Sequence, residues 1–172
     1  LKRHGVTVAC CPASNLKLAS GYANVPKMLE SGINVALGTD GAASNNNLNI
    51  MQDMYLFGVV YKGYFRDPTI ITPAEVLHAA TRAGALSQGR DDSGLLAVGM
   101  RADLCVLNTD TPQFTPMTSA ACNVVYAAQG ADIRMTMVDG EILYRDGEFK
   151  TIDIEKVKAE VQRRTDSILS RL

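Results

Sequence analysis

The first forty residues contain two short apolar runs with a helical pattern between them. Residues 6–10 and 33–37 are continuous, β-branched and too short for helices, which is typical of buried parallel strands. Between them, residues 25–32 have proline near the start and glycine at the end, as helices prefer. The segment 11–24 is expected to be a loop. The order strand, loop, helix, strand predicts one βαβ unit.

Two longer helices are expected next. Over residues 48–64, large apolar side chains recur at helical spacing and predict a core-facing stripe: Ile50, Met54, Phe57 and Tyr61. The sequence Thr-Pro-Ala-Glu at 72–75 is a capping box with proline at the first helical position. It predicts a third helix that runs to about Ser87.

The periodicity changes from helical to strand-like after Gly89. Residues 95–98 and 103–107 are expected to be short strands, and residues 134–138 and 141–145 a hairpin across Asp-Gly. Residues 153–172 form an amphipathic helical pattern with acidic residues early. We therefore expect a small β unit followed by a C-terminal helix.

Asp40 is the first candidate for chemistry, because it ends an apolar strand and is followed by small polar residues. In α/β folds, catalytic groups are placed at the carboxyl ends of strands. The alternative is a turn aspartate that caps the next helix, and Gly-Thr-Asp-Gly taken alone favours that alternative. Neighbouring motifs reverse the preference.

The sequence Cys-Cys-Pro-Ala-Ser-Asn-Leu-Lys-Leu at 10–18 and Gly-Thr-Asp-Gly-Ala-Ala-Ser-Asn-Asn at 38–46 resemble strands seven and eight of the amidohydrolase superfamily. The resemblance is to its methylthioadenosine/S-adenosylhomocysteine deaminase and chlorohydrolase branch. Ala-Thr-Arg-Ala-Gly-Ala at 80–85 and Gly-Met-Arg-Ala-Asp-Leu-Cys-Val-Leu at 99–107 are also similar to that branch.

The resemblance implies an α/β fold: the last strands and helices of a metal-dependent-hydrolase TIM barrel, part of a small β-sandwich, and a C-terminal helix. Residues 1–89 would belong to the (β/α)8 barrel, residues 90–150 to a composite β-sandwich with a returning helical segment, and residues 151–172 to the helix. A complete barrel needs about 250 residues. We therefore expect this chain of 172 residues to be the C-terminal portion of a longer protein.

For the site, the resemblance implies that Asp40 is a metal ligand and accepts the proton of the attacking water. One divalent metal is expected, zinc or else iron, incompletely liganded by this chain, because the family's histidine ligands and acidic glutamate would come from earlier strands. Neither histidine of this chain is expected to be a ligand. Cys10, which stands where many relatives carry histidine, and Ser14 and Asn15 are candidate substrate-binding residues.

The implied function is hydrolytic deamination of an adenine-like nucleoside, such as 5′-methylthioadenosine, S-adenosylhomocysteine or adenosine, by water activated at the metal. The alternatives are a chlorohydrolase, a guanine-deaminase-like amidohydrolase, and a non-catalytic fragment or assembly subunit. The isolated chain is expected to be inactive. Its expected partners are a small amino-heterocycle or nucleoside and the remainder of its own barrel or another copy, as a homo-oligomer.

Composition narrows the classes of partner. The chain is 47% hydrophobic and 20% charged with a net charge of −1, which is typical of a globular protein. Its lysines and arginines are scattered, which argues against nucleic acid, and its apolar runs are shorter than the roughly 20 residues of a membrane span. With no signal-peptide pattern, a cytoplasmic location is expected. The four cysteines contain no Cys-x-x-Cys pair and are expected to be reduced thiols.

Overall fold

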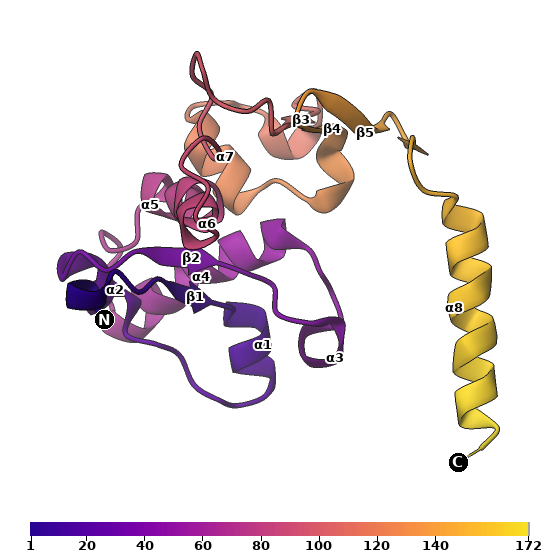
Figure 1. Cartoon of the computed structure of the whole chain (residues 1–172). Helices are drawn as coiled ribbons and strands as arrows, with labels where there is room; N and C mark the ends of the chain where they lie inside the picture. Colours follow the sequence, from indigo (N-terminus) through magenta and orange to yellow (C-terminus); the bar gives the residue numbers. More distant parts are fainter. Residues whose placement is uncertain (172) are drawn as a thin grey trace.

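The computed structural model describes residues 1–171 and contains the predicted βαβ unit. Strands β1 (Val8–Cys10) and β2 (Val35–Leu37) are parallel, with Cys10 opposite Leu37. Helix α2 (Val25–Glu30) connects them (Figure 1). The parallel pairing confirms the sequence interpretation. Because the strands are parallel, the segments that follow them emerge at the same edge.

Helices surround this pair, and two of them differ from expectation. They are α1 (Pro12–Lys17), α2, α3 (Ala42–Asn45), α4 (Ile50–Phe65), α5 (Pro73–Ala80) and α6 (Arg82–Ser87). The expected loop 11–24 contains α1, which begins with proline at its first position. The single helix expected from residue 73 to 87 is broken at Thr81, whose φ of −123° and ψ of −87° are not helical. The capping box at Thr72 and Glu75 is present as predicted.

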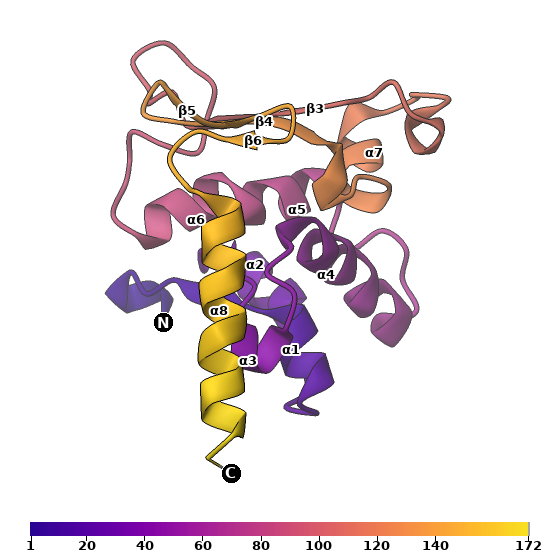
Figure 2. The ribbon, with the colours of Figure 1, turned by 90° about the vertical axis from the view of Figure 1, so that its right-hand side faces the viewer.

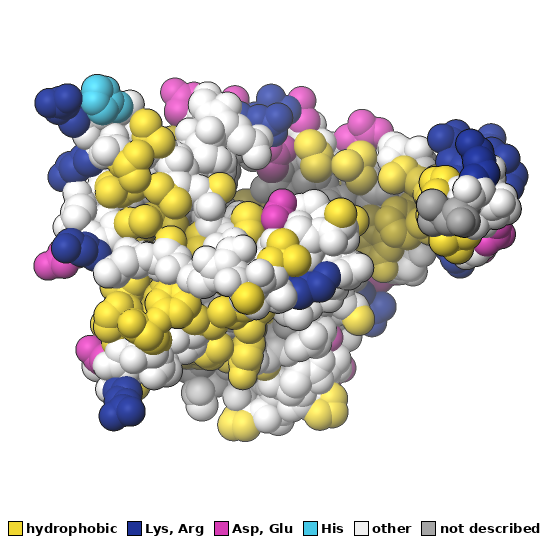
Figure 3. Space-filling view, turned by 90° about the horizontal axis from the view of Figure 1, so that it is seen from below, with side chains coloured by type: hydrophobic (Ala, Val, Ile, Leu, Met, Phe, Trp, Pro, Cys, Tyr) yellow, Lys and Arg dark blue, Asp and Glu magenta, His cyan; other side chains and the backbone are white. Residues whose placement is uncertain are grey.

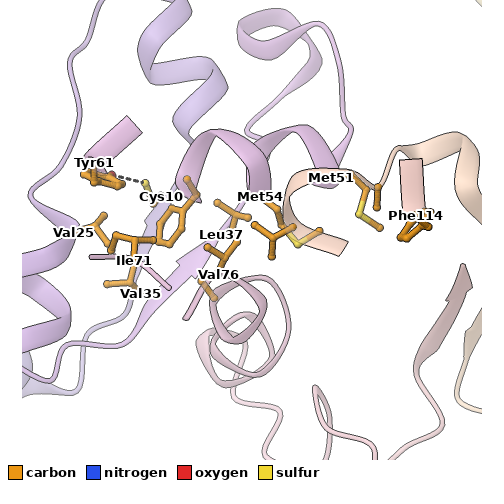
Figure 4. Packing of buried hydrophobic residues seen from close by; sticks show 14 residues of the cluster. Cys10, Val25, Val35, Leu37, Met51, Met54, Tyr61, Ile71, Val76 and Phe114 are labelled. Carbon is orange, nitrogen blue, oxygen red and sulfur yellow. Dashed lines mark hydrogen bonds between the residues drawn. The ribbon is translucent and has the colours of Figure 1, made fainter. Parts of the chain in front are cut away.

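The core lies between the two strands and α4 (Figure 4). The predicted stripe is confirmed, since Met54, Phe57 and Tyr61 are 3%, 0% and 1% exposed. Val76 of α5 and Val125 of α7 (Ala120–Tyr126) join the same cluster. One face of α4 therefore holds the parallel strands and the following helices in place.

A four-stranded antiparallel sheet forms a second layer. Its order is β3 (Leu104–Leu107), β4 (Ile133–Val138), β5 (Glu141–Arg145) and β6 (Glu148–Phe149). Short 3-10 turns, η1 (Lys2–His4), η2 (Pro112–Phe114) and η3 (Gly130–Asp132), complete the elements before the last helix. Asp139 and Gly140 both have positive φ, 53° and 82°, and form the predicted hairpin turn.

The expected strand at 95–98 is absent from the described part of the chain. Leu96 and Val98 are 82% and 107% exposed, and the sheet that these residues would join ends at β3. A strand needs a partner for its backbone groups. The prediction of a strand at 95–98 is therefore wrong for residues 1–171.

Helix α8 (Ile154–Leu169) lies apart from the rest of the molecule in Figure 1 and runs in front of it, downward from the sheet, in Figure 2. The amphipathic pattern is confirmed, but its apolar stripe is uncovered: Val157, Val161 and Ile168 are 44%, 58% and 59% exposed. Hydrophobic side chains also spread over the face of the body opposite the sheet (Figure 3). Within residues 1–171, no helix has the length and apolar character required to cross a membrane.

Candidate functional site

Asp40 and Ser14 meet where the chain leaves the carboxyl ends of the two parallel strands. Asp40 follows β2, and Ser14 lies in α1, which follows β1. The Ser14 hydroxyl donates to Asp40 Oδ2 at 2.7 Å, and the Gly41 backbone N–H donates to Asp40 Oδ1 at 2.7 Å. The sequence interpretation placed Asp40 and the 10–18 motif at this edge, and the geometry agrees with it.

The Asp40 carboxylate is exposed and ionised. The Ser14 hydroxyl, the Gly41 N–H and the Ser44 hydroxyl lower its pKa below the usual range, against a smaller effect of burial. Its backbone is left-handed, with φ of 62°, a conformation that aspartate adopts more readily than most residues other than glycine. The two hydrogen bonds to Oδ1 and Oδ2 fix the side chain on this backbone. An anionic oxygen is therefore held at the strand edge in a defined orientation.

The other candidate residues have different surroundings. Ser14 is 2% exposed and its hydroxyl is engaged by Asp40, so it acts as an anchor. Asn15 lies next to it and is partly exposed. Cys10 is 2% exposed and its Sγ lies 3.6 Å from Tyr61 Oη, inside the core (Figure 4). Burial raises the pKa of the Cys10 thiol.

Cys10 thus points toward Tyr61 of α4. A substrate contact by Cys10 would require this core packing to open. The adjacent Cys11 is partly exposed. A Cβ added at Gly38 would come within 3.2 Å of its sulfur, so glycine leaves room for this thiol.

Two buried polar residues were missed in the sequence. Asp53 of α4 is 0% exposed and Asn45 of α3 is 7% exposed, and the Asn45 amide donates to Asp53 Oδ2 at 3.1 Å. The available signal was an acidic residue immediately before Met54, within the apolar stripe of a helix. Its meaning depends on contacts with distant segments, which periodicity does not reveal.

Asp40 is the candidate metal ligand among residues 1–171. Among residues 1–171, no three His, Cys, Asp or Glu side chains come together in a way that could hold a metal ion. Both histidines, His4 and His78, are exposed. Catalytic zinc sites use three protein ligands and structural sites use four. Asp40 has the chemistry of one such ligand.

Comparison with curated proteins identifies similar sequences. The chain is 44% identical to a 5-methylthioadenosine/S-adenosylhomocysteine deaminase from Acetivibrio thermocellus, over 98% of this chain and 39% of that protein. It is 41% identical to a 5′-deoxyadenosine deaminase from Methanosarcina mazei, over 100% of this chain and 40% of that protein. The chain therefore spans about two fifths of the length of these relatives.

Solved structures and a family model agree with these relatives. An adenosine deaminase from Xanthomonas campestris with bound zinc superposes with a TM-score of 0.95 at 30% identity, over 98% of this chain and 39% of that one. A zinc-bound atrazine chlorohydrolase from Arthrobacter aurescens gives 0.84 at 27% identity, over 92% and 36%. The model of the amidohydrolase family matches residues 1–143. The chain belongs to the amidohydrolase family.

Proposed function

We propose that the protein carrying this chain is a metal-dependent aminohydrolase that releases ammonia from an adenine-like nucleoside. The observation that carries the proposal is Asp40, an exposed and ionised carboxylate anchored by Ser14 at the carboxyl edge of parallel strands. The deaminase names of relatives at 41–44% identity support the same substrate class. Residues 1–89 would complete the barrel, residues 90–150 a β-sandwich, and residues 151–172 a helix.

In this proposal, Asp40 is one ligand of a zinc ion and accepts the proton of the attacking water. When bound, the metal would lower the pKa of water toward neutrality. Ser14 and the Gly41 N–H hold the carboxylate in place, and Asn15 lies at the same edge, open to substrate. The remaining ligands and the group that protonates the ring would come from parts of the protein beyond residues 1–171.

A chlorohydrolase is the second candidate, because a zinc-bound atrazine chlorohydrolase shares this architecture with a TM-score of 0.84. The deaminase is favoured over it because the deaminase relatives are 41–44% identical, compared with 27% for the chlorohydrolase. A guanine-type substrate has no observation of its own to support it.

The test is a substrate comparison with the complete gene product loaded with zinc. We expect ammonia release from 5′-methylthioadenosine, S-adenosylhomocysteine or adenosine. We expect none from residues 1–172 alone, because no three potential ligand side chains come together within residues 1–171. Removing the metal with a chelator should abolish ammonia release, and added zinc should restore it. Chloride release from a chlorotriazine without ammonia release from any nucleoside would instead favour the chlorohydrolase.

Association is a further prediction for residues 1–172 expressed alone. Within residues 1–171, the pair β1 and β2 is a sheet of two strands, each with an unpaired edge, and the apolar stripe of α8 is exposed. Open edges and apolar patches favour pairing with another chain. We expect light scattering to show that the chain self-associates. Co-expression with the rest of the barrel should reduce this self-association. A monodisperse monomer with cooperative unfolding would contradict this.

A further inference from the structure

A buried carboxylate in α4 connects three segments around the site. Asp53 Oδ1 accepts the backbone N–H of Ala13 at 3.0 Å, and Oδ2 accepts the Asn45 side-chain amide at 3.1 Å. The same Asn45 nitrogen also donates to the backbone carbonyl of Thr39 at 2.7 Å. Asp53 therefore holds α1 directly and the end of the β2 segment through Asn45.

These contacts flank the hydrogen bond that orients Asp40. Ala13 precedes Ser14, the donor of that bond, and Thr39 precedes Asp40, its acceptor. The Ala13 N–H, next to the donor Ser14, binds Asp53 directly. The Thr39 carbonyl, next to the acceptor Asp40, is connected to Asp53 through Asn45. The left-handed backbone of Asp40 begins immediately after the Thr39 carbonyl that Asn45 binds.

An apolar side chain at position 53 would satisfy the packing of α4 at lower cost. Asp53 is 0% exposed and lies between the core residues Met51 and Met54. Burying a carboxylate costs free energy, because its charge loses its hydration. Burial raises the pKa of Asp53, whereas its bonds with Ala13 and Asn45 lower it. A carboxylate at this position provides two acceptor oxygens, one for Ala13 of α1 and one for Asn45 of α3.

We propose that Asp53 is a positioning residue for the Asp40 carboxylate, acting through Ala13 and Asn45. This inference rests on the proposed function, in which Asp40 is a zinc ligand. Through these contacts, Asp53 fixes the position of the Ser14 hydroxyl and the backbone conformation just before Asp40. Groups that orient a metal ligand from outside its contact shell typically change metal affinity or activity by about 10–100-fold when altered.

The test is Asp53→Asn in the complete gene product. Asparagine keeps the size and one acceptor oxygen for the Ala13 N–H, but its NH2 group faces the NH2 group of Asn45, and two donors cannot bond. We expect kcat and zinc affinity each to fall by about 10–100-fold. Zinc affinity is measured by competition with a chromophoric chelator on folded protein, which reports on the site independently of turnover.

Asp132→Asn is the matched control. Asp132 is buried, 7% exposed, and likewise accepts one backbone N–H, from Gln129 at 2.7 Å, and one side-chain amide, from Gln113 at 2.9 Å. It lies in η3, before β4, and its side-chain partners Gln113 and Gln129 differ from the residues that bind Asp53 and Asp40. Both variants should unfold at lower temperature, but only Asp53→Asn should lose zinc affinity and kcat. Unchanged zinc affinity and kcat in Asp53→Asn would overturn the inference and assign Asp53 to stability alone.

Asn45→Ala keeps the inference testable if Asp53→Asn does not fold. It removes the bridge to Thr39 and leaves the Ala13–Asp53 bond intact, so zinc affinity should again fall. Unchanged affinity in that variant would overturn the inference. A wild-type protein that neither binds zinc nor releases ammonia would overturn the proposed function itself, whereas an active wild type with an unaffected variant would overturn the positioning role alone.

Discussion

Replacing Asp40 with asparagine in the complete gene product is expected to lower kcat for ammonia release by at least about 10²–10⁴-fold, the range for loss of a proton-transfer group. The Asp40 carboxylate is ionised, because the Ser14 hydroxyl and the Gly41 N–H lower its pKa. An amide of the same shape is neutral, so it neither ligates as an anion nor accepts the proton of water. Steady-state ammonia release with saturating nucleoside and excess zinc measures the effect.

Asp67→Asn is the control for this substitution. Asp67 also accepts one backbone N–H and one hydroxyl, both from Thr69, at 2.8 and 2.6 Å, and these bonds likewise lower its pKa. It lies in the turn between α4 and α5, whereas Asp40 follows β2. We expect Asp67→Asn to leave kcat unchanged. If Asp40→Asn were equally active, a different carboxylate would perform the chemistry and the proposed function would lose its main support.

The parts of the fold that were predicted from the sequence depend on short-range signals. The stripe that includes Phe57 and Tyr61 requires one helical face, and the Asp-Gly pair at 139–140 favours a tight hairpin turn. Asp40 could be placed at a strand end because an apolar run stops there. Each of these features is determined within one segment, so neighbouring residues were sufficient to identify it.

What was missed depends on contacts between segments. Helix α1 has six residues, too few for a periodic pattern, and the apolar run at 6–10 does not reveal which face of β1 is covered by α4. The sequence alone therefore did not place Cys10 against Tyr61. Asp53 has partners 40 and 8 residues away in sequence, so its role emerges only when α1, α3 and α4 come together.

The largest effect on stability is expected from Phe57→Ala. Phe57 is 0% exposed at the centre of the core, and its ring meets that of Tyr61 edge-on, with centroids 5.8 Å apart. Removing a buried phenylalanine side chain typically destabilises a protein by about 3–5 kcal/mol, because contacts are lost and a cavity remains. That is a large share of the roughly 5–15 kcal/mol that stabilises a whole domain. Urea unfolding of the complete gene product, followed by circular dichroism, measures the change.

Phe65→Ala is the matched control, since the same side chain is removed from the same helix. Phe65 is the last residue of α4 and is 43% exposed, with an edge-on contact to Tyr64. Substitutions at exposed positions usually change the free energy of unfolding by less than about 0.5 kcal/mol. A clear difference between the two variants would show that α4 stabilises the fold through the face that packs on β1 and β2. If both variants lost equal stability, the core would not be centred on Phe57, and α4 would not be the element that holds the site's strands in register.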